Sequence, residues 1–389
     1  MLVNLSNLNA IELFAGIGGF RVAADSFGIK TVWANDIDAK ACLIYRSRFG
    51  DKEIREGDIS QFIDDLPSHQ LLTGGFPCQP FSSAGKKEGI RDPRGSLFQH
   101  IVTALRKHHP NYFVLENVKR LLTMEDGCHF ATILSALAEL DYHIEWRLLN
   151  AMQLGLPQNR QRIIILGIRK TSRQDPFDLS KIRLAPRDDF GDVPNDALAK
   201  LHDERKWSLI AKHGASFPCW GIANKSKFMG FDLQTFSAAS APVMLKRVLQ
   251  PDPAPEFDFT QSTLERLPAN SEVKRYVGGV EILSNQGGGA RMGYTIFGIN
   301  GVAPTLTAAT SRHYERYAIN GRYRRLTNVE YARIQGFPDD HCREVSVYDQ
   351  YALYGNAVPP PLVKWVFERL SGEGEIPPKP RQLELAEMA

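Results

Sequence analysis

Two apolar runs of the sequence are followed by residues suited to covalent or acid–base chemistry. Leu71–Gly74 leads into Gly-Phe-Pro-Cys78, and Tyr112–Leu115 leads into Glu116. A free thiol with a pKa of about 8.5 is a few per cent thiolate at neutral pH, and the thiolate is a strong nucleophile. A carboxylate at the end of an apolar run is desolvated, which raises its pKa. A core cysteine and a capping or ion-paired glutamate are the ordinary alternatives.

Two arginines precede another apolar run at a spacing suited to an anion. Gln158-Asn-Arg160-Gln-Arg162 leads directly into the run Ile163–Ile168. Side chains two positions apart on an extended chain share one face, so Arg160 and Arg162 can both aim at one anionic target. Surface ion pairs are the alternative.

A glycine-rich loop follows the first apolar run, Ala10–Phe14. Its residues Gly16, Gly18 and Gly19 come just before a helical pattern. Glycines there let the backbone approach a ligand closely, and a helix amino terminus attracts negative charge. The spacing departs from the dinucleotide pattern G-x-G-x-x-G, which disfavours a nicotinamide-dependent oxidoreductase. A plain tight turn is the alternative for the loop alone.

Acidic residues follow the next two expected strands. Asp36 comes after Thr31–Ala34, about 20 positions beyond the glycine loop, where it is placed to bind ribose hydroxyls. Asp58 is placed to accept a hydrogen bond from an adenine amino group. Either aspartate could instead be a helix cap. Together with the glycine loop, they predict a cofactor that contains adenosine.

The elements that must position these residues alternate between strand and helix up to about residue 170. The expected strands are Ala10–Phe14, Thr31–Ala34, Leu71–Gly74, Tyr112–Leu115, Ile144–Leu149 and Ile163–Ile168, with a further strand before Gly57. The expected helices are Gly19–Phe27, Lys40–Phe49, Ser96–His108 and Phe130–Leu140. This alternation predicts an α/β domain with a largely parallel sheet, helices on both faces and ligands beyond the carboxyl ends of the strands.

The chain changes character after residue 170. Residues 171–325 are rich in glycine and proline with weak periodicity, and they include a cluster of arginines and tyrosines at 312–325. So much irregular chain indicates a binding module. Helices are expected again at Thr327–Gly336 and Pro361–Leu370, and the tail 372–389 is expected to be mobile.

Composition sets few limits on function. The 389 residues carry a formal net charge of +3, and the five scattered cysteines form no CxxC pair. This pattern argues against a disulfide framework and a structural zinc site, and it favours a reducing cytosol. No secretion signal or apolar run of membrane-spanning length is found. We expect a cytoplasmic protein that needs no metal.

These motifs, in this order, resemble those of the DNA (cytosine-5-)-methyltransferases of prokaryotic restriction–modification systems. Pro77-Cys78-Gln79 is similar to the family's nucleophile motif, Glu116-Asn117-Val118 to its glutamate motif and Gln158-x-Arg160-x-Arg162 to its paired-arginine motif. Residues 325–338 and Gly355-Asn356-Ala357-Val358 are similar to its last two motifs. The resemblance covers roughly residues 8–170 and 300–370, and 171–300 match poorly.

The resemblance implies a fold, an activity and a set of site residues. The fold is a Rossmann-like, S-adenosylmethionine-dependent methyltransferase domain at 1–170, a smaller irregular target-recognition domain at 171–325, and helices at 326–371 that return to the catalytic domain. The activity is methylation of carbon 5 of a flipped-out cytosine in double-stranded DNA through a covalent Cys78 adduct. The catalytic residues would be Cys78, Glu116, Arg160 and Arg162. The cofactor would contact Phe14, Gly16, Ile17, Gly18, Gly19, Asp36, Ile37, Asp58, Ile59, Pro80, Asn356 and Ala357. DNA would contact Gln79, Ser82, Arg94, Arg291, Thr305, Arg312 and Arg316.

The expected partners follow from this activity. They are double-stranded DNA and, in a restriction–modification pair, an endonuclease for the same site. The enzyme itself is expected to be a monomer in the cytoplasm, associated with the nucleoid. Two other functions stay open. A tRNA methyltransferase branch shares this catalytic domain, although the long segment 171–325 favours duplex DNA. A catalytically inactive nucleic-acid-binding protein is disfavoured by the presence of Cys78, Glu116 and Arg162.

Overall fold

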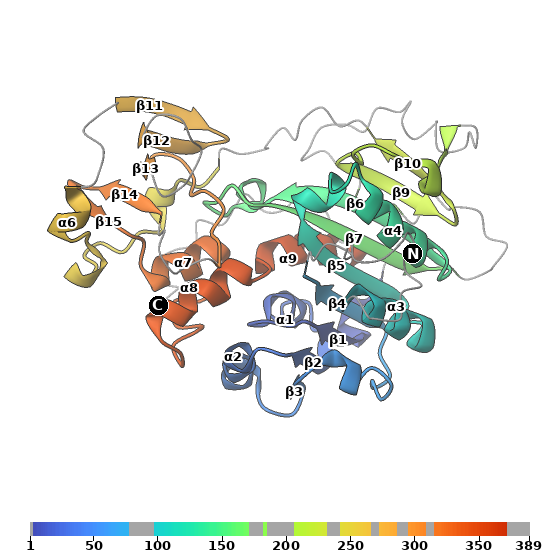
Figure 1. The fold of residues 1–389 in the computed structure, drawn as a ribbon. Coiled ribbons are helices and arrows are strands. Elements are labelled where there is room, and N and C mark those ends of the chain that lie inside the picture. Colours follow the sequence, from blue (N-terminus) through green and yellow to red (C-terminus); the bar gives the residue numbers. More distant parts are fainter. Residues whose placement is uncertain are drawn as a thin grey trace.

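A computed structural model describes residues 3–77, 97–170, 182–184, 206–231, 242–265, 272–285, 295–308 and 315–371. The predicted tail, 372–389, lies outside these ranges. Two sheets dominate the described chain, and they occupy opposite ends of the molecule (Figure 1). We call the large sheet with its covering helices the first lobe, and the small sheet with its short helices the second lobe.

The first half of the large sheet is parallel, as the alternation of elements predicts. The strand order is β3-β2-β1-β4-β5-β7-β6-β9-β10-β8. The strands of the parallel half are β1 (Asn9–Leu13), β2 (Lys30–Asp36), β3 (Ile54–Glu56), β4 (Leu71–Gly75) and β5 (Tyr112–Val118). The sheet then turns antiparallel, because β6 (Tyr142–Asn150) joins β7 (Gln161–Arg169) through only a short 3-10 helix, Ala151–Leu154.

Helices cover both faces of this sheet. On one face lie α3 (Leu97–His108) and α4 (Cys128–Ala138), which pack on Ile11 and Leu13. The other face carries α1 (Gly19–Asp25) and α9 (Pro360–Ser371), which pack on Ala10, while α2 (Ala39–Phe49) packs on Ala34. Neighbouring strand residues point to opposite faces, so one strand serves both layers. The predicted α/β fold is confirmed.

Part of the segment after residue 170 returns to the large sheet. The strands β8 (Ser208–Leu209), β9 (Trp220–Asn224) and β10 (Lys227–Phe231) extend it through antiparallel pairing of β9 with β6. The buried Glu145 of β6 accepts hydrogen bonds from Trp220 Nε1 at 2.8 Å and from the backbone N–H of Leu184 at 3.0 Å. The sequence boundary expected at residue 170 therefore differs from the division between the two sheets.

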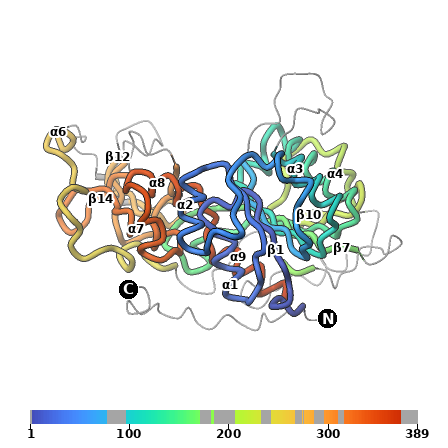
Figure 2. Tube along the Cα trace, turned by 90° about the horizontal axis from the view of Figure 1, so that it is seen from below, coloured from blue at the N-terminus to red at the C-terminus, as the bar shows by residue number. Residues whose placement is uncertain are grey.

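The second lobe is built on a five-stranded sheet of order β11-β12-β13-β14-β15. The strands are β11 (Glu272–Val277), β12 (Val280–Asn285), β13 (Thr295–Phe297), β14 (Arg316–Ile319) and β15 (Arg322–Arg324). A short helix, α6 (Gln261–Leu264), and the 3-10 helices Leu245–Arg247 and Pro255–Phe257 accompany them. Seen from below, α6 and β14 lie at one end of the molecule, and α3, α4 and β10 at the other (Figure 2).

Two helices lie between the lobes. The helix α7 (Asn328–Gln335) begins at a capping box formed by Thr327 and Glu330, and α8 (Val347–Asn356) follows it. Their residues Tyr331 and Tyr354 share one apolar cluster with Phe297 of the second sheet and Ile44 of α2. Of the expected C-terminal helices, α9 returns to the large sheet, whereas α7 packs on both lobes; α8 was not predicted.

Candidate active site

The carboxyl end of β5 holds an ion pair. Arg162 Nε lies 2.7 Å from Glu116 Oε1, and both side chains are almost fully buried. The two residues meet because β5 and β7 are antiparallel neighbours, with Arg162 opposite Val118. Glu116 lies inside β5, two residues before its end, rather than after the strand as expected. Burial raises the pKa of Glu116, and the charges of Arg162 and Arg160 oppose that rise without cancelling it.

The first arginine of the motif, Arg160, points elsewhere. The buried guanidinium of Arg160 donates hydrogen bonds to the carbonyl oxygens of Leu306 at 2.9 Å, Gly355 at 2.9 Å and Ala357 at 3.0 Å. The expectation that both arginines aim at one anionic target is therefore wrong. Its premise of an extended chain fails, because β7 begins only at Gln161 and the Arg160 N–H bonds back to the carbonyl of Gln158.

Gln158 joins the two lobes beside Arg160. We call the region where Gln158 and Arg160 contact Leu306, Gln335, Gly355 and Ala357 the seam. Its side chain accepts from the N–H of Leu306 at 3.1 Å and donates to Gln335 Oε1 at 3.1 Å, and it is fully buried. Thr305 belongs to the same seam, because its hydroxyl donates to the carbonyl of Asn159 at 2.6 Å. Sequence reasoning quoted Gln158 as part of a motif and assigned it no role, since its partners lie more than 140 positions away along the chain.

Asn117 connects the acid to the segment that leads to the expected nucleophile. Its Nδ2 donates to the carbonyl of Phe76 at 2.9 Å, two residues before Cys78. The carboxylate of Glu116 lies beside Gly75, where a built Cβ would be 3.4 Å from Oε2, an ordinary contact distance. Cys78 lies outside the described residues, as do six further predicted site residues: Gln79, Pro80, Ser82, Arg94, Arg291 and Arg312.

The glycine loop and the end of β2 form one unit. Asp36 Oδ2 accepts from the N–H of Gly16 at 2.7 Å, and Oδ1 accepts from the N–H of Asp38 at 2.9 Å. Asn35 Nδ2 donates to the carbonyl of Gly57 at 2.9 Å, which joins the third strand end to the same place. The three polar segments that the sequence singled out therefore converge at one edge of the sheet.

This edge has the features of a ligand site. Gly16 has a φ of 54° and nothing within 4 Å of a built Cβ, and the side chain of Ile37 is exposed (69%). An exposed apolar side chain beside a carboxylate and an open backbone loop suits the flat base and the hydroxylated sugar of an adenosine. Phe14 also has a positive φ, 55°, which places it in a backbone region rare for a side chain of its size.

Other residues expected at the cofactor contribute to the framework. The side chains of Ile17 and Ile59 are buried in apolar clusters, and Asp58 caps a 3-10 helix (Ile59–Gln61) through the N–H of Ser60 at 2.8 Å. Gly19 allows a close approach, since a Cβ there would lie 2.1 Å from the carbonyl oxygen of Val358.

The segment at the end of α8 reaches the same edge. Ala357 is buried and immediately precedes Val358, whose carbonyl lies against Gly19. Asn356, the last residue of α8, is exposed. The last motif of the chain therefore lies against its first one, although more than 300 residues separate them.

Sequence reasoning missed Glu12, a buried carboxyl group in β1. Tyr45 OH donates to Glu12 Oε2 at 3.1 Å. Burial raises the pKa of Glu12 to about 8, although the Tyr45 bond and the charge of Arg21 act in the opposite direction. The signal was a carboxylate inside the apolar run Ala10–Phe14.

Comparison with known proteins decides the family. Residues 8–372 match the model of the C-5 cytosine-specific DNA methylases. The chain belongs to this family. It is 32% identical over 363 residues to the type II methyltransferase M1.ScrFI of Lactococcus lactis subsp. cremoris, covering 92% of this chain and 77% of that one. It is 30% identical over 358 residues to M.HhaI of Haemophilus parahaemolyticus, covering 91% of each.

The fold comparison agrees. The solved structure of the Dnmt2 methyltransferase of S. pombe has a TM-score of 0.62 at 18% identity and covers 94% of this chain and 99% of that chain. The predicted resemblance, fold class and enzyme class are confirmed, and the nicotinamide-dependent alternative is set aside. The chain is a methylase that acts on carbon 5 of cytosine in DNA. Within the described residues, no helix is long and apolar enough to span a membrane.

Two cavities of this methylase carry basic residues. A cavity of about 430 Å³ lies at the seam between the lobes, beside Arg162. Its lining comprises Val118, Lys119, Arg120, Asn159, Gln161 and Arg162 from the first lobe and Val280, Pro304 and Thr305 from the second. Thr305, expected to contact DNA, therefore faces the same space as Arg162.

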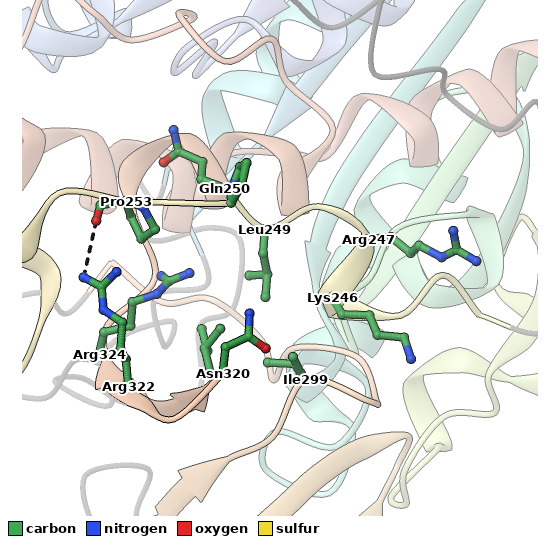
Figure 3. Close-up of a pocket in the computed structure, with 11 residues that line it drawn as sticks. Lys246, Arg247, Leu249, Gln250, Pro253, Ile299, Asn320, Arg322 and Arg324 are labelled. Carbon is green, nitrogen blue, oxygen red and sulfur yellow. Dashed lines mark hydrogen bonds between the residues drawn. The ribbon is translucent and has the colours of Figure 1, made fainter.

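The other cavity, of about 450 Å³, lies within the second lobe (Figure 3). Lys246 and Arg247 occupy one end of it, and Arg322 and Arg324 the other. Both of the latter are neutralised, Arg322 by Asp258 at 2.9 Å and Arg324 by Glu330 at 2.7 Å. Arg316, predicted to contact phosphate, lies in β14, paired with Ile296 of β13.

Proposed function

We propose that the methylase works by covalent catalysis, with Cys78 as nucleophile and Glu116 as the acid that activates the target base. The observation that carries this assignment is the buried Glu116–Arg162 pair, whose carboxyl group also approaches Gly75 in the strand that leads to Cys78. Burial raises the pKa of Glu116, and a raised pKa favours the protonated form that a general acid needs.

Each proposed group acts on a named atom of cytosine. The thiolate of Cys78 attacks carbon 6, while Glu116 donates a proton to nitrogen 3, so the ring becomes an enamine that is nucleophilic at carbon 5. A positioned acid of this kind typically contributes about 10²–10⁴ in rate. Arg162 orients the carboxyl group and donates to the carbonyl oxygen of the base. After methylation, the carbon 5 proton passes to solvent, nitrogen 3 returns its proton to Glu116, and Cys78 leaves carbon 6 as the thiolate. Arg160 holds the seam that frames the site.

S-adenosylmethionine fits the edge formed by the glycine loop and Asp36, and it supplies an electrophilic methyl group bonded to sulfur. The backbone of Phe14 and Gly16 lines the loop, Asp36 is placed for the ribose hydroxyls, and Ile37 offers an apolar surface to the adenine. Ile17 and Ile59 support this edge with buried side chains, and Asp58, whose Oδ1 accepts from the N–H of Ser60, is placed for the adenine amino group.

The proposed substrate is duplex DNA with the target cytosine turned out of the helix, because a stacked base cannot reach a buried acid. The second lobe, with Thr305, Arg316 and the predicted contacts Arg291 and Arg312, serves as the recognition module. The predicted contacts Gln79, Ser82 and Arg94 follow the nucleophile. We propose that the enzyme is a monomer, that it associates with DNA in the cytoplasm, and that an endonuclease for the same site accompanies it.

The test begins with bisulfite sequencing of DNA from cells that express the protein, which reveals activity and recognised site together. Duplexes of that site with 5-fluorocytosine at the target should then form an adduct that survives denaturation, because fluorine is not eliminated as a proton is. Peptide mapping should place the adduct on Cys78, and Cys78→Ser should abolish both adduct and turnover.

The control is Cys128→Ser, which changes an exposed cysteine outside the site and should leave adduct and turnover intact. An adduct on Cys42, Cys128, Cys219 or Cys342 would overturn the nucleophile assignment. Methylation of tRNA with none of duplex DNA would overturn the substrate.

A further inference from the structure

The interlobe cavity beside Arg162 has a basic rim. Lys119 and Arg120 begin a 3-10 helix, Lys119–Leu122, directly after the catalytic strand β5. None of the residues that line this cavity is acidic. The rim therefore presents positive charge to whatever enters between the lobes.

The backbone of the rim is firmly held. Leu121 and Leu122 are buried in the main apolar cluster, and the carbonyl of Arg120 accepts hydrogen bonds from the N–H groups of Thr123 and Met124, both at 3.0 Å. The side chains of Lys119 and Arg120 are nevertheless exposed. Rigid backbone under two exposed cations places their charge close to Arg162 without fixing the side chains on protein partners.

Three arginines around the two cavities are paired with carboxylates. Arg162 pairs with Glu116, Arg322 with Asp258 and Arg324 with Glu330. Across the described chain, by contrast, neither the Lys119 nor the Arg120 side chain makes an ion pair or hydrogen bond. Two cations left without carboxylates at the mouth of a substrate cavity suit an anion that arrives with the substrate, and DNA supplies phosphodiesters.

We propose that Lys119 and Arg120 bind the backbone phosphates that flank the everted nucleotide. The proposal rests on the proposed function, since it takes the cavity beside Arg162 to receive the target base. The position points to the stage after eversion, because the two cations lie with Val118 and Arg162 at the cavity that we take to receive the target base, where the phosphates of an everted nucleotide would lie. The pair therefore stabilises the everted state rather than general contact with DNA.

The experiment compares the full-length wild type with Lys119→Gln, Arg120→Gln and the double variant. Affinity is measured across a range of salt concentrations for the cognate duplex and for a duplex without the site. For cognate DNA we expect the slope of log affinity against log salt to fall by about 0.9 for each phosphate that the variant no longer neutralises. The slope for non-specific DNA should stay that of the wild type, and so should cofactor affinity.

Arg106→Gln is the matched control. Arg106 is an exposed arginine near the carboxyl end of α3. It lies near the start of β5, whereas Val118 and the cavity lie at the other end of that strand. A double variant with the same cognate slope as Arg106→Gln would overturn the proposal. An equal loss of slope on the cognate and the non-specific duplex would also overturn it, because it would mean phosphate binding without a link to eversion. Failure of the wild type to methylate DNA would instead refute the proposed function.

Discussion

The cofactor edge and the interlobe seam of this methylase are built in opposite ways. At the cofactor edge, neighbouring strands of one sheet bring together Gly16, Asp36 and Gly57 through bonds that span about 20 residues. At the seam, Gln158 and Arg160 reach partners 146 to 197 residues away, and both side chains are fully buried. The first site follows from sheet topology, whereas the second follows from how two lobes pack.

This difference divides the labour of the paired motif. Arg162 turns toward the sheet and pairs with Glu116, while Arg160 turns toward Leu306 and the end of α8 and donates to three carbonyl oxygens. One short segment thus carries both a catalytic contact and a structural one. Substitutions at the Glu116–Arg162 pair should lower the methylation rate, whereas substitutions at Arg160 should lower the free energy of unfolding.

The largest effect is expected at the catalytic side. Glu116→Gln should lower the methylation rate by about 10²–10⁴, because glutamine keeps the shape and hydrogen-bonding capacity but supplies no proton. DNA affinity should change little. Single-turnover rates with tritiated S-adenosylmethionine measure the first quantity, and a rate within about tenfold of the wild type would remove Glu116 from the acid role.

The next effect is expected at the seam. Arg160→Met keeps much of the side-chain volume but leaves three buried carbonyls without their donor, at about 1–3 kcal/mol each. We expect the free energy of unfolding in urea to fall by about 3 kcal/mol or more. Arg106→Met, on the exposed face of α3, is the control and should stay within about 0.5 kcal/mol. An equally mild effect of Arg160→Met would contradict the structural role of the seam.

The same contrast explains what the sequence could predict. Apolar runs ending in Asp36 and Glu116 marked strand ends that parallel pairing brings to one edge, so the site was predictable from local pattern. The seam was not, because nothing near Gln158 indicates Leu306 or Gln335 as partners. The return of β9 to β6 was hidden for the same reason, since it depends on Trp220 meeting Glu145.

Asn117 and Glu12 show a subtler limit. Both were visible as polar residues in apolar strands, but their roles depend on partners at Phe76 and Tyr45. A pattern of residue types reports where a polar group lies along the chain. It does not report whether that group faces a ligand or a neighbouring element.

An effect that depends on pH, a change in the slope of stability against pH, is expected at Glu12, under the cofactor loop. Its pKa is raised from 4.5 to about 8, so the folded state keeps a proton that the unfolded state releases above about pH 4.5. The stability from this proton is complete below pH 4.5 and is lost as pH rises toward 8. Glu12→Gln removes the titration, so the unfolding free energy of the wild type relative to the variant should fall with pH by at most about 1.4 kcal/mol per unit.

Urea denaturation at intervals between pH 5 and 8 measures this difference, with Glu139→Gln as the control, because Glu139 at the end of α4 is exposed and stays hydrated in the folded protein. The expected curve falls for Glu12 and stays flat for Glu139. A flat curve for both would mean that Glu12 is ionised in the folded protein, held by the Tyr45 hydroxyl and Arg21. The cofactor edge would then depend on a buried charge. It would resemble the seam, where the buried cation Arg160 is held by fixed carbonyl partners.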